Sequence, residues 1–357
     1  MTGFGVRLAS AVGVIATLVL GGAAPAEAHT VHVGVDPSNW RSAVTAVTPQ
    51  TSDMRVSLGD DAQRLTLSVT GRAQVVVAGY HDEPFLRLAR NGVWMNQRAT
   101  TSWTIAGPQA TQPPDVNDHA APRWKQVATT GTWRWHDART HWAGYALPPT
   151  VALHPDRRQF VEEWLVPLTV DGRTGVITGR LDWIPGPNPA PGAALVVVPA
   201  GVLLAIGLVR RWRTAAVVAL VALIGLDVVH SIGMVTGRVG STWTRLAALP
   251  GHGAFAAVLW LGMLACAVGI ARRRHLTFSV YAAAMLSAIV FLTDGVPSIA
   301  LVWRSQAITG LPVALDRYLV AALTGGSLGL LIATILLIRR LDRRTPMSTQ
   351  PPRLAAA

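Results

Sequence analysis

The sequence predicts two fold classes in one chain: an exported all-β domain with an Ig-like antiparallel sandwich, and then an all-α transmembrane bundle of five helices. The composition supports a membrane protein, because 50% of the residues are hydrophobic and only 14% are charged, against about 25% charged residues in ordinary soluble domains. Short β-branched runs fill the first half of the chain, and long apolar runs fill the second half. These two patterns place the boundary between the two classes near residue 185.

The N-terminus has the pattern of a signal peptide. Arg7 supplies a positive charge, residues 8–20 are apolar, and residues 26–28 (Ala-Glu-Ala) form a small-x-small cleavage motif. We therefore predict that residues 1–28 are removed and that the mature chain begins at His29. An uncleaved N-terminal anchor is the alternative.

Residues 29–185 make up the predicted exported domain. Turn signals such as Asn91-Gly92 and Asp171-Gly172 separate short alternating runs, as in antiparallel sandwiches and barrels. The predicted strands are Met54–Leu58, Arg64–Val69, Gln74–Ala78, Gly92–Met95, Glu163–Val170 and Gly175–Trp183. Residues 100–155 are rich in Pro, Trp and His and are predicted to be long loops with little regular structure. The only cysteine, Cys266, lies in an apolar run, so the exported domain has no disulfide.

A Pro/Gly-rich linker, residues 186–192, leads into residues 193–340, the predicted five-helix domain. Each apolar segment is about long enough to cross a bilayer. The segments are 193–209, 214–235, 252–270, 276–293 and 316–338. Arginine clusters follow the first, third and fifth segments, which places these ends and the tail 341–357 in the cytoplasm. We therefore expect a multi-pass plasma-membrane protein with its N-terminal domain outside and its C-terminus inside.

Ionisable side chains inside the predicted spans are candidate functional groups, because they are costly in lipid. Asp227 and His230 are three residues apart and share one helical face. His252 and Asp294 fall at a similar depth, toward the outer side. The functional interpretation is a metal or proton site between helices, with Asp227, His230 and His252 as ligands. The structural interpretation is pairing between helices and capping in interfacial water.

The stretch from His252 to Gly262, with Trp260, resembles the histidine–small residues–Trp-x-Gly helix of the bacterial copper-resistance D membrane family. The partner C family is an exported β-sandwich whose mature chain starts with a copper-binding histidine. This resemblance implies copper as a ligand, with His29 as the external site. Separately, the run WHDARTHW, the segment LDWIPGPNP and the use of one lysine only, Lys125, resemble uncharacterised actinobacterial membrane proteins, which implies no particular activity.

Residues 134–145, RWHDARTHWAGY, contain the densest group of chemically active side chains in the exported domain. His136 and His141 point about 140° apart on an ideal helix and to opposite faces of a strand, so they converge on one metal only on an irregular backbone. The alternative is an aromatic knot in which Arg139 pairs with Asp137 or Asp82. The predicted binding surface consists of Trp135, Asp137, Arg139 and Trp142.

Three functions are compatible with these features. The net charge of +12 does not indicate nucleic-acid binding, because many of the arginines flank apolar runs. The sequence contains no P-loop, no H-E-x-x-H and no G-x-G-x-x-G motif, which favours a binding or accessory role over catalysis. We therefore expect an envelope protein that contacts the lipid bilayer and a protein or metal partner. Copper handling by His29 and the loop histidines, and a membrane-bound enzyme with a His-rich site, are the alternatives.

Overall fold

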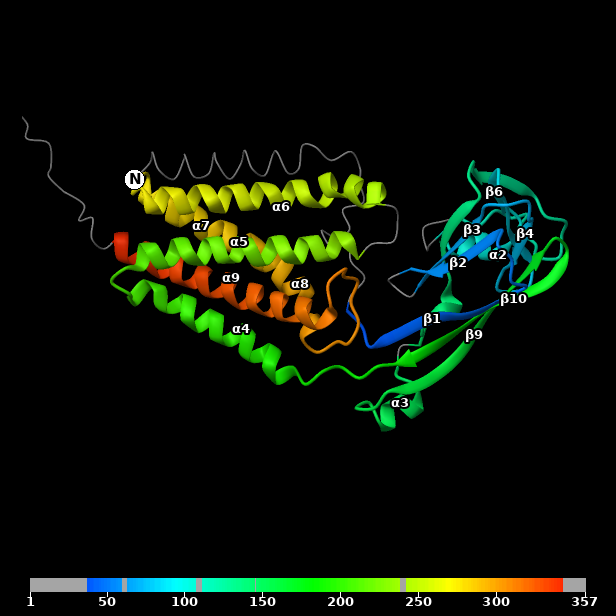
Figure 1. Cartoon of the computed structure of the whole chain (residues 1–357), viewed down its shortest axis with the longest axis horizontal. Helices are drawn as coiled ribbons and strands as arrows, with labels where there is room; N and C mark the ends of the chain where they lie inside the picture. The colour runs from blue at the N-terminus through cyan, green and yellow to red at the C-terminus, as the bar shows by residue number, and fades with distance from the viewer. Residues whose placement is uncertain (1–36, 60–62, 107–110, 145, 238–241, 343–357) are drawn as a thin grey trace, which may run out of the picture. The chain divides into compact units, whose positions relative to one another are not determined.

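The computed structural model describes residues 37–59, 63–106, 111–144, 146–237 and 242–342, with the side chains of residues 242–254 and 340–342 excepted. Figure 1 shows strands in the first half of the chain and helices in the second half. The signal-peptide prediction and His29 lie outside the described residues.

The larger sheet is antiparallel and has seven strands in the order β1-β10-β9-β4-β5-β6-β7. The strands in that order are β1 Trp40–Thr48, β10 Arg173–Trp183, β9 Gln159–Val170, β4 Val75–Ala78, β5 Pro84–Ala89, β6 Gly92–Asn96 and β7 Trp124–Ala128. The longest pairing joins β9 and β10, which run from either side of the turn at Asp171 and Gly172. Both turn residues have positive φ, of 51° and 77°, so the turn signal in the sequence marks a real hairpin.

The smaller sheet is also antiparallel, with three strands in the order β2-β3-β8. Strands β2 Met54–Leu58 and β3 Arg64–Val69 have the predicted bounds, and β8 is Thr132–His136. The prediction of long irregular loops over residues 100–155 was wrong in part. This stretch contains α2 Thr100–Thr104, β7, β8, the 3-10 turn η1 Ala138–Thr140 and α3 Pro149–Leu153.

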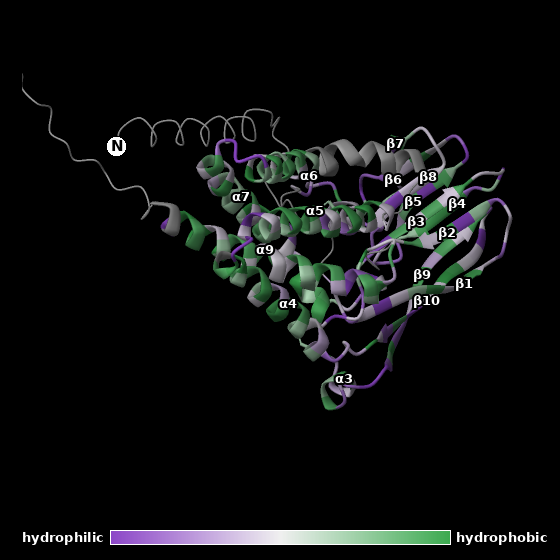
Figure 2. Cartoon of the chain, turned by 60° about the vertical axis from the view of Figure 1, so that its left-hand side comes forward, coloured by the Kyte–Doolittle hydropathy of each residue, from purple (hydrophilic) through white to green (hydrophobic). Residues whose placement is uncertain are grey.

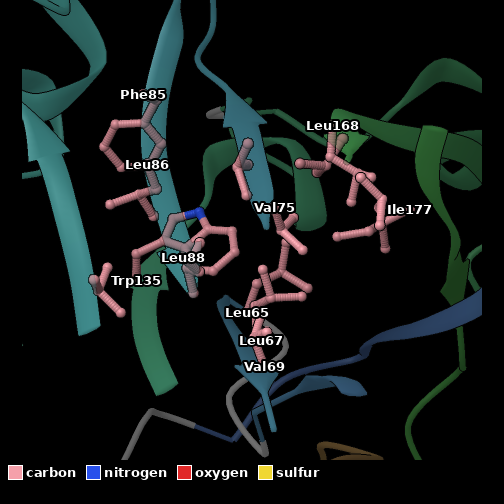
Figure 3. Packing of buried hydrophobic residues seen from close by; sticks show 14 of the residues in the cluster. Leu65, Leu67, Val69, Val75, Phe85, Leu86, Leu88, Trp135, Leu168 and Ile177 are labelled. Carbon is pink, nitrogen blue, oxygen red and sulfur yellow. The ribbon is translucent and has the colours of Figure 1, made fainter. Parts of the chain in front are cut away.

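The two sheets share one hydrophobic core. Leu65 and Leu67 of β3 and Trp135 of β8 contribute from the smaller sheet, and they cluster with Phe85 and Ile177 from the larger one. Figure 3 shows these side chains pointing into the same interior. Phe85 meets Trp135 edge to face, with ring centroids 6.4 Å apart. Because no cysteine is available in this domain, this packing holds the two sheets together.

The second half of the chain is helical, and Figure 2 shows mainly hydrophobic residues along its helices. The helical elements are α4 Pro189–Leu204, η2 Ala205–Leu208, α5 Trp212–Thr236, α6 Thr242–Ala271, α7 Leu276–Val290, the π-helical turn η3 Phe291–Gly295, α8 Val296–Ser298, η4 Ile299–Val302 and α9 Val313–Asp342. Helix α4 begins at Pro189, inside the segment predicted as a linker.

Three helices within the described residues are long and apolar enough to cross a membrane: residues 212–236, 276–302 and 313–339. Two shorter apolar helices, Pro189–Leu204 and Phe255–Ala271, accompany them. Length and composition thus support three of the five predicted spans. The short apolar run after Asp294 continues the helix that starts at Leu276.

Helix α9 packs against α4, α5 and α7. Its glycines bring α4 close: a Cβ on Gly325 would overlap the carbonyl oxygen of Val196, and one on Gly329 would overlap that of Ala200. Small residues four positions apart allow this kind of close helix approach in membranes. The pattern G-x-S-x-G at residues 325–329 therefore serves packing, and Ser327 donates a hydrogen bond to the carbonyl of Thr324, at 3.1 Å.

Candidate functional site

Asp137 is the centre of a hydrogen-bonded knot at the end of β8. Its side chain is fully buried and accepts a hydrogen bond from Trp135 Nε1, at 2.9 Å. Arg139 donates from Nε to Oδ1 and from Nη2 to Oδ2, both at 2.8 Å. Burial alone raises the pKa of Asp137, but the hydrogen bonds and charge of Arg139 and the Trp135 hydrogen bond hold it below its ordinary value.

Arg139 also ties this knot to the turn that follows β4. Its guanidinium donates to the carbonyls of Ala78 and Gly79, at 3.3 and 3.2 Å, and lies 5.1 Å from the centre of the Tyr80 ring. The hydroxyl of Tyr80 accepts a hydrogen bond from the backbone N–H of Ala138, at 3.0 Å. The ion pair between Arg139 and Asp137, one of the two pairings expected for an aromatic knot, is therefore present.

Two residues of the predicted binding surface lie inside the domain. Trp135 is 3% exposed and Asp137 is 0% exposed, because both complete the core and the knot. They support the surface from beneath and do not contact solvent. Arg139 and Trp142 remain partly exposed and reach the surface beside them.

The two loop histidines come together in the structure. The rings of His136 and His141 lie with centroids 4.9 Å apart and planes at 57°. Asp137 caps the intervening 3-10 turn by accepting from the backbone N–H of Arg139, at 3.1 Å. This turn supplies the irregular backbone that convergence of the two histidines requires.

An open groove of about 500 Å³ lies against this loop. The residues that line it include Trp142, His141, Arg139, Glu162 and Glu163. Trp164 also lines it, but it is only 3% exposed and belongs to the hydrophobic core. Both glutamates reach the same groove although they are adjacent on β9. A register shift in the pairing of β9 with β10, next to Glu162, interrupts the strict alternation there.

The walls of the groove are fixed by hydrogen bonds and stacking. Trp142 donates from Nε1 to the carbonyl of Ala146, at 2.8 Å, and stacks on Trp40 with centroids 6.1 Å apart. Trp164 donates from Nε1 to the hydroxyl of Ser42, at 2.8 Å. Both indoles are therefore held in place by contacts within the domain, with Trp142 partly exposed and Trp164 in the core.

His81, Glu83 and Asp118 form a second polar cluster in the β-domain. Their potential metal-ligand atoms all lie within 4.8 Å of one another. Among the described residues, no other group of three or more histidine, cysteine, aspartate or glutamate side chains meets this criterion. His81 Nδ1 is 2.8 Å from Asp118 Oδ2, and this hydrogen bond raises the pKa of His81. The other carboxylate oxygens are engaged by backbone N–H groups: Asp118 accepts from Thr100, and Glu83 from Thr101 and His81. In the sequence, His81 and Glu83 stand together in the turn-like stretch His81-Asp82-Glu83-Pro84. Asp118 lies 37 positions after His81, so no local pattern joins it to them.

In the helical half, the predicted neighbours Asp227 and His230 each bond to another helix. His230 Nδ1 lies 2.8 Å from Oδ1 of Asp316 on α9, and Asp227 accepts from Trp260 Nε1 of α6, at 2.6 Å. Asp316 is the residue that sequence reasoning missed, because it stands at the very start of an apolar segment and looks like its boundary. His252 belongs to α6, but its side chain lies outside the described residues.

The chain combines an antiparallel β-domain with a helical part in which three described helices are long and apolar enough to cross a membrane. Comparisons with protein-family models, with curated proteins and with solved structures found no match for this chain.

Proposed function

We propose that the chain is a multi-pass membrane protein whose exported β-sandwich domain is a binding module for an envelope partner. In this proposal five helices cross the membrane, the arginine clusters lie in the cytoplasm and the β-domain faces outside. The single observation that carries the binding role is the groove beside η1, where the fixed and partly exposed indole of Trp142 lies next to charged residues of both signs. Fixed aromatic anchors surrounded by polar groups are typical of surfaces that bind proteins.

The groove is suited to an extended segment of a partner protein. It is open to solvent and is lined by residues 162–165 of β9, where Leu165 is 49% exposed although it sits in the middle of a strand. An apolar side chain of the partner would pack on Leu165 and Trp142, and its basic groups would face Glu162 and Glu163.

Site-specific photo-crosslinking in intact cells tests this function. Leu165→benzoylphenylalanine places a photo-reactive ring in the groove, and Leu153→benzoylphenylalanine, at a position 74% exposed in α3, is the matched control outside it. We expect one defined protein adduct from position 165 that Trp142→Ala abolishes. No adduct at position 165, or the same adduct at both positions, would contradict the proposal.

Copper binding is the second candidate, and the proximity of His136 and His141 favours it. Two imidazoles are donors that suit copper or zinc. Neither Glu162 nor Glu163 completes a group with them in which all ligand atoms lie within 4.8 Å of one another, so any further donors would come from elsewhere. Titration of the detergent-solubilised full chain with Cu(II) should then show one equivalent that is lost in His141→Ala and kept in His154→Ala. Loss in His29→Ala alone would instead assign the metal to the N-terminus, and mass spectrometry of the mature chain would show whether that N-terminus is free.

A further inference from the structure

A buried histidine–aspartate pair joins two candidate membrane spans. His230 of α5 and Asp316 of α9 are 86 positions apart in the sequence and 2.8 Å apart in space. Their side chains are 5% and 1% exposed. Ionisable groups at such positions in membrane helices are costly to bury, so they mark pathways or binding sites more often than simple packing.

Two carboxylate oxygens of this region find no hydrogen-bond partner among the described residues. They are Oδ1 of Asp227 and Oδ2 of Asp316, and both atoms are fully buried. The residues themselves are 2% and 1% exposed. A buried, unpaired carboxylate oxygen is expensive in a protein interior, and more so in a bilayer where no bulk water can solvate it. A bound proton would remove the negative charge from such a carboxylate without needing extra space.

A third carboxyl group approaches from the π-helical turn η3. Asp294 interacts electrostatically with both Asp227 and His230, and it accepts a hydrogen bond from Thr293 Oγ1, at 2.5 Å. A π-turn inside a helix is often placed where a functional side chain must be presented. Three helical elements thus each contribute a carboxyl group to this region, and the imidazole of His230 bonds to that of Asp316.

The charges of this cluster do not balance if every carboxyl group is ionised. His230 can neutralise one carboxylate, and two would remain. Arg317 follows Asp316 in the sequence, but its guanidinium donates hydrogen bonds to the carbonyls of Leu301 and Arg304, at 2.9 and 3.0 Å. Trp260 donates one hydrogen bond to Asp227 but carries no charge.

We propose that Asp227, His230 and Asp316, with Asp294, form a proton-binding site inside the membrane domain. A proton added to Asp227 turns an unpaired oxygen into a hydroxyl group and removes a buried charge in the same step. A proton shared between His230 and Asp316 holds α5 against α9. A metal ion fits less well, because no three of these groups place ligand atoms within 4.8 Å of one another.

The position of the cluster indicates how protons reach it. Asp227 and His230 lie in the second half of α5, Asp294 follows α7, and Asp316 is in the first turn of α9. In the proposed topology all four lie toward the outer face. The site is therefore within reach of protons from the side that carries the β-domain.

Infrared difference spectroscopy on the full chain in liposomes tests this site. Between alkaline and acidic buffer, a buried carboxyl group that takes up a proton gives a carbonyl-stretch band shifted from that of exposed acids. We expect this band in the natural protein, its loss in Asp227→Asn, and its shift in His230→Gln. Asp115→Asn, which removes an exposed carboxylate, is the control and should leave the band unchanged.

Two further measurements keep the result decisive. Thermal unfolding of each variant shows whether that variant is folded. If Asp227→Asn or His230→Gln does not fold, the near-isosteric variant Asp316→Asn is measured in its place. The spectra are repeated with excess Zn²⁺ and with excess Na⁺ at constant pH. Absence of the shifted band over the whole pH range would overturn the proposal. Abolition of the band by Zn²⁺ or Na⁺ would also overturn it, because the site would then bind a metal ion.

Discussion

Arg139 donates two hydrogen bonds of 2.8 Å to the carboxylate of Asp137, and Trp135 donates a third hydrogen bond to the same carboxylate. This fork fixes the 3-10 turn that carries His141 and the rim of the groove. The motif RWHDARTHWAGY is therefore a structural knot at its centre and an exposed surface at its edge. The proposed binding role requires both parts, because the knot fixes the loop that lines the groove.

Arg139→Ala should destabilise the β-domain strongly. Removing one partner of a buried ion pair leaves an uncompensated charge and costs about 3–5 kcal/mol. Thermal unfolding of the solubilised chain, followed by near-ultraviolet circular dichroism, measures the effect. The control is Arg123→Ala, whose partner Asp115 is exposed and whose loss should cost about 0–1 kcal/mol. Equal losses in the two variants would contradict the central role of the knot.

The stability of the knot should also depend on pH. The pKa of Asp137 is lower in the folded chain than its ordinary value, so its contribution is present above about pH 3.9 and is lost as the pH falls through the lowered pKa. The difference in unfolding temperature between the natural chain and Arg139→Ala should therefore shrink in acid. A constant difference down to strongly acidic pH would show that the pair is not ionic.

His81 should titrate above an ordinary histidine. The hydrogen bond to Asp118 raises its pKa from 6.5, so the stabilisation from this pair is complete below that value and is lost as the pH rises through the raised pKa. Nuclear magnetic resonance of histidine-labelled protein measures the titration directly. Asp118→Asn should return the pKa of His81 toward its ordinary value, while Asp115→Asn should leave it unchanged.

Gly179→Ala should disturb the groove through Trp164. A Cβ at this position on β10 would overlap the indole ring of Trp164, and overpacking of this kind costs about 1–3 kcal/mol. The matched control is Gly201→Ala in α4, where the new methyl group meets nothing within 4 Å. Unfolding midpoints and crosslinking from position 165 distinguish the two variants. Gly179→Ala should lose both stability and the crosslinked adduct, and Gly201→Ala should lose neither. An unchanged adduct in Gly179→Ala would show that Trp164 does not shape the binding surface.

The proposed topology predicts which sites a membrane-impermeant thiol reagent reaches. In a Cys266→Ser background, Ala138→Cys on the exposed surface of η1 should be labelled in intact cells. Arg272→Cys, in the arginine cluster after α6, should be labelled only after the membrane is opened. The reverse pattern would invert the orientation of the whole chain.

The sequence alone determined the elements that carry their own periodicity. Alternating apolar residues and turn signals predicted β2 and β3 with their bounds, and long apolar runs predicted the helical half. Strand β1 was missed, because it shows little alternation of burial and is defined by its pairing with β10. Strands β7 and β8 were missed because proline- and tryptophan-rich surroundings hide their short patterns.

Only the tertiary structure decided the candidate sites. His230 and Asp316 are 86 residues apart, and His81 and Asp118 are 37 apart, so no local pattern connects them. Likewise, the burial of Asp137 and the exposure of Leu165 depend on what packs against them. Hydrophobic periodicity is a local property of the chain and can be read from the sequence. Which polar groups meet, and whether water reaches them, depends on contacts between distant segments and is decided when the chain folds.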